Sequence, residues 1–305
     1  MLRYFIKRML QTIPLLIIVS LVIFMFIRMI PGDPARMLAG HDATLEEIEA
    51  ITRHYGLDDP LFVQYTRYIS GLLSGDLGTS IRTGRPVADM LLPRYQPTFT
   101  LALTSMSWAL VFGLTIGIIS AVFRGKWPDY MGMLLAVTGI SIPSFWMGLM
   151  LIQRFSVEMS IFAVTGLNRP RDFVLPSVTL GAGIMAMIAR NSRSEMVETM
   201  RHDYIRTARA KGLSEPEVIV KHALRNSIVQ VMTIVGLQFG FLLGGSVIVE
   251  RVFGIAGLGG LLIDSIFFRD YTVIQAQLAI FAFLFIMINL LVDLMYGLLN
   301  PKIRY

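Results

Sequence analysis

The chain has 305 residues, of which 54% are hydrophobic and only 16% are charged. Soluble domains are typically about 45–50% apolar and about 25% charged, so this composition indicates a membrane protein. The absence of cysteine excludes disulfides and thiolate metal ligands, and the four histidines show no paired ligand spacing. The net charge of +6 favours basic cytoplasmic loops over nucleic-acid binding, because positive residues hold loops on the inner side of a membrane.

Six apolar segments are long enough to cross the membrane as helices, which takes about 20 residues for roughly 30 Å of hydrocarbon. The expected spans are residues 9–29, 99–123, 131–155 (with Pro143), 173–189, 228–249 and 272–299. We therefore predict an all-α membrane protein with six transmembrane helices. The apolar run of the first span exceeds the roughly 7–15 residues of a secretory signal peptide, so we expect a retained helix.

The lysines predict which way the loops face. All five lie at the N-terminus, in the loops after the second and fourth spans, or at the C-terminus: Lys7, Lys126, Lys211, Lys221 and Lys302. A chain with six spans brings these four places to one side of the membrane. Because positive residues stay inside, we expect that side, with both termini, to be cytoplasmic.

The long segment after the first span divides the chain. We expect residues 1–30 to form an amphipathic start and the first span, residues 31–98 an extracytoplasmic segment, and residues 99–305 the core of the protein. Thr44-Leu-Glu-Glu47 is typical of a capping box that begins a helix. A second short helix is expected over residues 61–73. The segment is therefore predicted to be a small extracytoplasmic cap rather than a separate domain.

The sequence carries no enzyme signature. The phosphate loop G-x-x-x-x-G-K-[ST], H-E-x-x-H and G-x-S-x-G are all absent, so active transport would need energy from a partner or an ion gradient. Ion-coupled transporters usually carry ionisable residues deep in their spans. Asp293, one turn after Asn289, is the main such residue, and we interpret it as structural. An ion-coupled transporter or channel without an ATPase is the alternative function.

The fifth span carries glycines four residues apart. Small residues at this spacing form a groove that another helix can approach closely. The groove either packs helices within one subunit or lines a seam between two subunits through which a solute passes. The candidates for such a path are Gly236, Gln238, Gly240, Gly244 and Ser246.

The loop between the fourth and fifth spans, residues 190–225, is polar and basic. Tyr204-Ile-Arg-Thr-Ala-Arg-Ala-Lys211 suits a short helix, with Asp203 as its N-cap and Gly212 as its C-terminal stop. A second helix is expected to follow. A loop that only set the topology could be shorter, so two ordered helices around a glycine indicate a docking element for another protein.

This loop resembles that of the membrane subunits of bacterial ABC importers, whose pattern is E-A-A, three residues, G, nine residues and I-x-L-P. Ala208, Gly212 and Leu224 match literally, and residues 203–212 and 221–226 resemble the dipeptide and oligopeptide branch. Further segments of that branch are Pro31-Gly-Asp-Pro34, Gly75-Asp-Leu-Gly78, Asp270-Tyr-Thr-Val-Ile-Gln275 and Asn300-Pro-Lys-Ile-Arg304. One departure is Ile255-Ala256, which precedes Gly257-Leu-Gly259 where the family usually has Trp-Pro. Within the branch, residues 237–246 look most like the permease of glutathione importers.

The resemblance implies a type I ABC importer permease fold in the bacterial inner membrane. It implies a heterodimer with a second permease, two cytoplasmic ATPase subunits that hold ATP and Mg, and an extracytoplasmic solute-binding protein. The chain itself would bind no cofactor or metal, do no catalysis, and contact lipid but no nucleic acid. The solute would be a peptide, a peptide-like compound or glutathione. The residues implied to couple to the ATPase are Asp203, Tyr204, Arg206, Thr207, Ala208, Arg209, Ala210, Lys211, Gly212 and Leu213.

Overall fold

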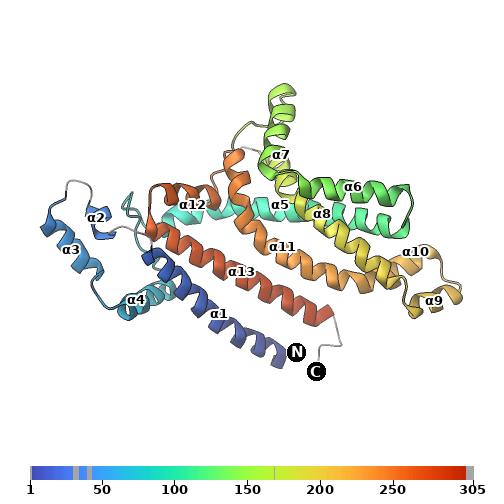
Figure 1. The fold of residues 1–305 in the computed structure, drawn as a ribbon, viewed down its shortest axis with the longest axis horizontal. Coiled ribbons are helices and arrows are strands. Elements are labelled where there is room, and N and C mark those ends of the chain that lie inside the picture. The colour runs from blue at the N-terminus through green and yellow to red at the C-terminus, as the bar shows by residue number, and fades with distance from the viewer. Residues whose placement is uncertain (1, 30–33, 40–42, 168, 300–305) are drawn as a thin grey trace.

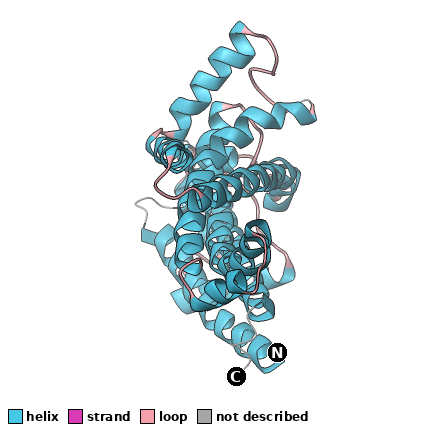
Figure 2. Cartoon of the chain, turned by 90° about the vertical axis from the view of Figure 1, so that its right-hand side faces the viewer, coloured by secondary structure: helices cyan, strands magenta, loops and turns pink. Residues whose placement is uncertain are grey.

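The computed structural model describes residues 2–29, 34–39, 43–167 and 169–299, and this part of the chain consists of helices and loops (Figures 1 and 2). The motifs at residues 31–33 and 300–304 lie outside the described residues. The helices are α1 (Leu2–Met29), α2 (Pro34–Ala39), α3 (Leu45–Tyr55), α4 (Leu61–Ser74), α5 (Val87–Val122), α6 (Trp127–Ser141), α7 (Ser144–Leu151), α8 (Val174–Thr199), α9 (Asp203–Ala210), α10 (Glu215–Glu217), α11 (Arg225–Val252), α12 (Leu258–Phe267) and α13 (Tyr271–Leu299). π-Helical turns cover Ile152–Glu158 and Val218–Leu224, and a 3-10 turn covers Pro170–Phe173.

Among the described residues, four helices are long and apolar enough to cross a membrane, and up to six spans result if each of two bent helix pairs counts as one. The four are α1, α5, α8 and α13. One bent pair is α6 with α7 and the turn after it, and the other is Glu215–Ile228 with Val231–Leu242, whose break lies within α11. This confirms the predicted all-α membrane fold and is compatible with six spans.

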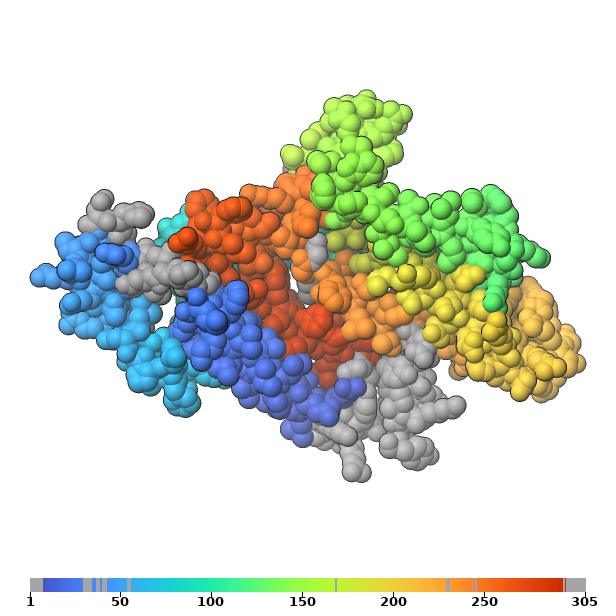
Figure 3. Space-filling model, in the orientation of Figure 1, coloured from blue at the N-terminus to red at the C-terminus, as the bar shows by residue number. Residues whose placement is uncertain are grey.

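The expected third span is not one straight helix. α6 ends at Ser141, α7 begins at Ser144, and the two are bent by 101°. Pro143 accounts for the break, because proline has no amide hydrogen to donate and restricts the residue before it to extended backbone. The space-filling view shows α7 and the turn after it projecting from the bundle (Figure 3).

The second and fourth spans extend beyond their expected bounds. α5 begins at Val87 rather than Phe99, and it continues through two prolines. Val87 and Leu91 are buried against α12 and α13, and such tertiary packing overrides weak local propensity. α8 continues to Thr199, so the first part of the loop expected from residue 190 is still helix.

The core of the bundle is the contact between α5 and α8, with α6 and α11 beside them. Two glycines permit this close approach: a Cβ at Gly113 would overlap Ile188, and a Cβ at Gly117 would overlap Ser192. Because lipid tails are as apolar as leucine, spans associate through such close packing and through hydrogen bonds. α5 and α8 therefore form the closely packed centre of the bundle, which connects the end with α9 to the end with α12.

The small helices after α1 lie at the end of the molecule opposite α9 (Figure 1). The predicted capping box is present, with the Glu47 amide donating to Thr44 Oγ1 at 3.3 Å and the Thr44 amide donating to Glu47 Oε2 at 2.8 Å. α4 reaches back to α1, where Arg28 donates to Gln64 Oε1 at 2.6 Å. α1 in turn lies beside α13 (Figure 1).

Candidate functional site

The residues expected to couple to an ATPase lie in one short helix and the turn after it, at the tip of the molecule (Figure 1). α9 ends in a left-handed turn at Gly212, whose φ is 79°. The Gly212 amide donates to the Arg209 carbonyl at 2.9 Å, and the Leu213 amide donates to the Ala208 carbonyl at 3.4 Å. This pair of bonds defines a Schellman C-cap. No described atom lies within 4 Å of the place a Cβ would take, so backbone conformation rather than space favours glycine.

α9 has one buried face and one exposed face. Ile205 and Ala208 are 0% and 5% exposed and pack into one cluster with Met196 and Val218. The exposed residues of the segment are Asp203, Tyr204, Arg206, Thr207, Arg209, Ala210, Lys211 and Gly212. Ala208 therefore anchors the helix, and the exposed set is available to a partner.

The prediction of Asp203 as the N-cap is wrong. His202 holds that position with extended backbone, and Asp203 is the first residue of the helix. A carboxylate in the first turn still interacts favourably with the positive end of the helix dipole. The aromatic ring of His202 also stacks on Tyr204, with centroids 5.7 Å apart.

Polar contacts that were not predicted from the sequence connect α9 to the next helices. Arg209 Nε lies 2.7 Å from Glu215 Oε1, which joins α9 to α10 across the Gly212 turn. Asn226 Nδ2 donates to the Tyr204 hydroxyl at 3.0 Å, which joins α9 to α11. Nothing in the sequence around Glu215, apart from its position after the Gly212 turn, indicates that it pairs with Arg209.

A partly buried ion pair lies where α6 begins and α8 approaches its end. Arg193 Nε donates to Asp129 Oδ1 at 2.5 Å, and an Arg193 terminal nitrogen donates to Oδ2 at 2.7 Å. The Gly125 amide also donates to Asp129 at 2.9 Å. The Asp129 side chain is only 3% exposed. The pair fixes the turn between α5 and α6 to the part of α8 that leads to α9.

The structure does not bring the five candidate path residues onto one surface. Gly236 and Gly240 face α13, where an added Cβ would overlap Val292 and Phe285 respectively. Gly244 is exposed, with no described atom within 4 Å of an added Cβ. The two contacts with α13 match the interpretation that the glycines pack helices within one subunit.

The other two candidates lie in different surroundings. Gln238 lines a cavity of about 260 Å³ between α6, α7, α8 and α11. Ser246 is completely buried and hydrogen-bonds to Glu250. The side chain of Asp293 lies outside the described residues, and Asn289 Nδ2 donates to the Phe285 carbonyl at 2.8 Å.

A single open face runs along α11. Exposed residues recur at alternating steps of four and three, the spacing that keeps side chains on one side of a helix. They are Leu237, Phe241, Gly244, Ile248 and Arg251. The face stays largely exposed, although Phe241 meets the ring of Phe285 edge-on and Arg251 pairs with Asp264, and it passes the cavity that Gln238 lines.

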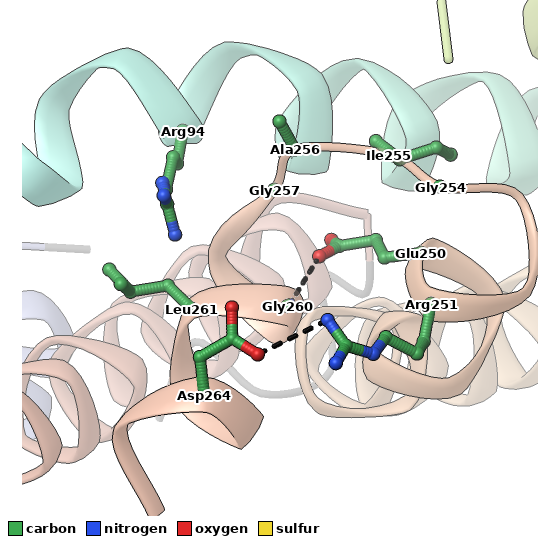
Figure 4. Close-up of a pocket in the computed structure, with 10 residues that line it drawn as sticks. All are labelled: Arg94, Glu250, Arg251, Gly254, Ile255, Ala256, Gly257, Gly260, Leu261 and Asp264. Atoms are coloured by element: carbon green, nitrogen blue, oxygen red, sulfur yellow. Dashed lines mark hydrogen bonds and ion pairs between the residues drawn. The ribbon is translucent and has the colours of Figure 1, made fainter. Parts of the chain in front are cut away.

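At the end opposite α9, a buried carboxylate joins three helices. Glu250 of α11 is 0% exposed. It accepts from Thr98 Oγ1 at 2.7 Å and from the Gly259 amide at 2.7 Å. It also accepts from the Gly260 amide at 3.2 Å (Figure 4). Thr98 in turn accepts from the Leu258 amide at 2.9 Å. We call Glu250, Thr98 and these three amides the Glu250 cluster.

The bundle of apolar spans, with a short polar helix exposed at one end, defines a polytopic transport permease. Residues 113–305 match the family of binding-protein-dependent transport system inner membrane components, and residues 1–102 match the N-terminal region of such membrane components. The chain belongs to this family and is the multi-pass transmembrane subunit of an ABC importer, a complex that also contains ATPase and permease subunits.

Curated relatives match over their whole length. A glutathione transport system permease protein, GsiC, of Escherichia coli O6:H1 (strain CFT073) is 52% identical over 305 residues, which are 100% of both chains. The protein of the same name from Escherichia coli K12 is 51% identical over the same coverage. Both are named as permeases and not as enzymes.

Solved structures share the fold. An inward-facing MetNI methionine ABC transporter matches with a TM-score of 0.59 and 20% identity, over 69% of this chain and 96% of that chain. An amino acid ABC transporter matches with a TM-score of 0.52 and 17% identity, over 71% and 95% of the two chains. At these identities the likeness concerns the fold alone.

Proposed function

We propose that this chain forms half of the membrane channel of an importer for glutathione or similar short peptides. The observation that carries the proposal is identity of 51–52% over all 305 residues with permeases named for glutathione transport. Both proteins are matched from end to end, so all the spans and the loops between them are included in the likeness.

The complex is a heterodimer with a second permease, two cytoplasmic ATPase subunits that bind ATP and Mg, and an extracytoplasmic solute-binding protein. α9 is the coupling helix, and the exposed side chains between Asp203 and Lys211 enter a cleft of one ATPase. α8 continues from the bundle to within a few residues of α9. Because α8 packs tightly on α5, a displacement of α9 by the ATPase moves α8 and α5 together.

The α9 end is cytoplasmic, and so are both termini. The topology supports this orientation, since α11 leads away from α9 and α13 returns toward it, beside α1 (Figure 1). Lys126 and Lys211 lie in the turns next to α6 and α9, and Lys221 lies in the π-helical turn before α11, as expected for a cytoplasmic surface. The small helices α2 to α4 then form the extracytoplasmic cap, which ends before α5 begins at Val87 rather than extending to residue 98.

Transport by the reconstituted complex tests the proposal. Proteoliposomes contain both permeases and both ATPases, with ATP inside and the solute-binding protein outside, and uptake of radiolabelled glutathione is measured. We expect glutathione uptake to require both ATP and the binding protein. Excess unlabelled short peptides should reduce this uptake. Vesicles with ADP are the matched control. Uptake of a nickel chelate or an opine, with none of glutathione or any short peptide, would contradict the proposal.

A further inference from the structure

Two neighbouring cavities at the α12 end of the molecule share a basic wall. The first has a volume of about 410 Å³ and lies between Arg94 of α5, Arg251 of α11 and the start of α12 (Figure 4). The second, of about 330 Å³, continues past Arg94 to Arg82 and Phe268. Arg94, Leu261 and Asp264 belong to both. We call the two cavities together the α12 basin.

The carboxylates around the α12 basin are already engaged by donors of this chain. Glu250 accepts the three bonds of the Glu250 cluster. Asp270, 3% exposed, accepts from Ser80 Oγ at 2.5 Å and from the Ile81 amide at 3.2 Å. Both carboxylates line the basin, but they are buried and their hydrogen bonds are made to donors of this chain.

The arginines of the basin differ in how they are held. Arg82 lies over the ring of Phe268, 3.3 Å from its centroid. Arg251 pairs with Asp264 at 3.2 Å, but the two side chains are 56% and 42% exposed, and exposed pairs of this kind are weak. Arg94 is half-buried, and among the described residues no acidic side chain pairs with it. Figure 4 shows its guanidinium directed into the gap between α5 and α12.

The wall that faces Arg94 is fixed in place. The Glu250 cluster attaches the first turn of α12 to α5 and α11, and Gln277 of α13 donates to the Leu258 carbonyl. A Cβ at Gly257 would overlap both Glu250 and Thr98, so the turn must bring bare backbone to the cluster. A cavity with fixed walls can bind a ligand without first ordering its own side chains, which lowers the entropic cost of binding.

The basin is also continuous with the open face of α11. Arg251 is the last residue of that face, one turn beyond Ile248. A ligand bound between Arg94 and Arg251 would therefore lie at the end of the open face that passes Phe241 and the Gln238 cavity.

We propose that the α12 basin binds a carboxylate of the solute as it leaves the binding protein. Arg94 donates to the carboxylate, and Arg251 adds a second cation when its weak pair with Asp264 opens. The guanidinium fork matches a carboxylate in shape and charge, and about 410 Å³ is within the usual range of about 300–1,000 Å³ for small-molecule sites. The inference rests on the proposed function, because a short peptide carries a C-terminal carboxylate and glutathione carries two.

The test compares a short peptide with its C-terminal amide in proteoliposomes, each supplied on saturated binding protein. The variants are Arg94→Gln, Arg94→Lys and, as a matched control at the same end of the molecule, Arg36→Gln on α2. We expect Arg94→Gln to slow uptake of the free acid about tenfold or more, because one charge-assisted hydrogen bond is lost. Uptake of the amide should change less than about twofold. Arg94→Lys should retain part of the preference, and Arg36→Gln all of it.

Three outcomes would overturn the inference. The first is an unchanged ratio of acid to amide uptake in Arg94→Gln. The second is an equal fall for both solutes, which would mean that Arg94 is structural. The third is a fall in ATP hydrolysis stimulated by solute-free binding protein, which would mean that Arg94 pairs with that protein instead. In each case, normal peptide uptake by the unaltered complex still supports the proposed function. If the unaltered complex takes up no peptide, both the proposed function and this inference are contradicted.

Discussion

The two ends of this permease are built in opposite ways. At the α9 end, a short helix exposes its charged side chains and is held by a few apolar residues, among them Ile205 at 0% exposure. At the α12 end, the charged group is inside: Glu250 is fully buried and its hydrogen bonds join α5, α11 and α12. The first arrangement offers groups to a partner, and the second fixes helices to one another.

The difference suggests that the two ends have different roles, one in contact with a partner subunit and the other in holding the helices of this chain together. A helix that engages a separate subunit must present polar groups in water and keep its own conformation, which α9 achieves with its C-cap at Gly212. The helices at the α12 end keep a defined arrangement through buried hydrogen bonds, and an unsatisfied polar group there would be costly. Substitutions at the two ends should therefore affect different quantities, coupling at one end and stability at the other.

The largest expected effect is at the Glu250 cluster. Glu250→Ala would leave the Thr98 hydroxyl and two α12 amides without their acceptor, so we expect a loss of about 3–5 kcal/mol in the free energy of unfolding. Thermal unfolding of the purified subunit complex measures it. Asp264→Asn is the control, because Asp264 is 42% exposed and should cost less than about 1 kcal/mol. Equal effects of the two substitutions would mean that the α12 end does not depend on a buried carboxylate.

The next effect in size is at the ion pair between α6 and α8. Asp129→Ala should destabilise the protein by about 2–4 kcal/mol, since it leaves Arg193 partly buried without its partner. A double-mutant cycle with Arg193→Ala measures the interaction itself, and we expect the double variant to be less destabilised than the sum of the singles. Simple additivity would show that the two residues act independently.

A smaller effect is expected within α11. Gly240→Ala forces a methyl group against Phe285 and should cost about 1–3 kcal/mol. The matched control is Gly244→Ala, which meets open space and gains up to about 1 kcal/mol from helix propensity. Gly240→Leu should impair assembly of the complex as well as uptake. Normal stability and uptake in the Gly240 variants would contradict the close contact between α11 and α13.

The smallest effect on stability, but a large one on function, is expected at Gly212. Gly212→Val places a β-branched residue at a φ of 79°, which costs about 1–2 kcal/mol locally and distorts the end of α9. We expect ATP hydrolysis to continue while uptake per ATP falls. Gly212→Asn should retain coupling, since asparagine tolerates the left-handed region. If the Val variant transports as well as the Asn variant, the shape of this turn is irrelevant to coupling.

The sequence was most informative where local chemistry decides the structure. The Thr44 capping box and the stop at Gly212 follow from rules that act over a few residues, and both are present. The early start of α5 at Val87 was missed because burial against α12 and α13 decides it. The 101° bend also exceeded what a lone Pro143 predicts.

Long-range polar pairs were beyond the sequence for the same reason. Arg193 and Asp129 are 64 positions apart, and Thr98 and Glu250 are 152 apart, so no local pattern links them. The coupling segment could be predicted because its residues are contiguous, and it stays a prediction. The Glu250 cluster and the α12 basin could not be predicted, because the fold assembles them from α5, α11 and α12.

Site-directed cross-linking tests the central claim, that α9 contacts an ATPase subunit, most directly. The chain contains no cysteine, so Arg206→Cys on α9 introduces a single thiol that carries a photoactivated maleimide cross-linker in native membranes. Leu73→Cys on α4, also exposed but at the opposite end, is the control. We predict a cross-linked product with an ATPase subunit from position 206 and none from position 73. Absence of the ATPase from the products at 206, or its presence equally at 73, would contradict the account.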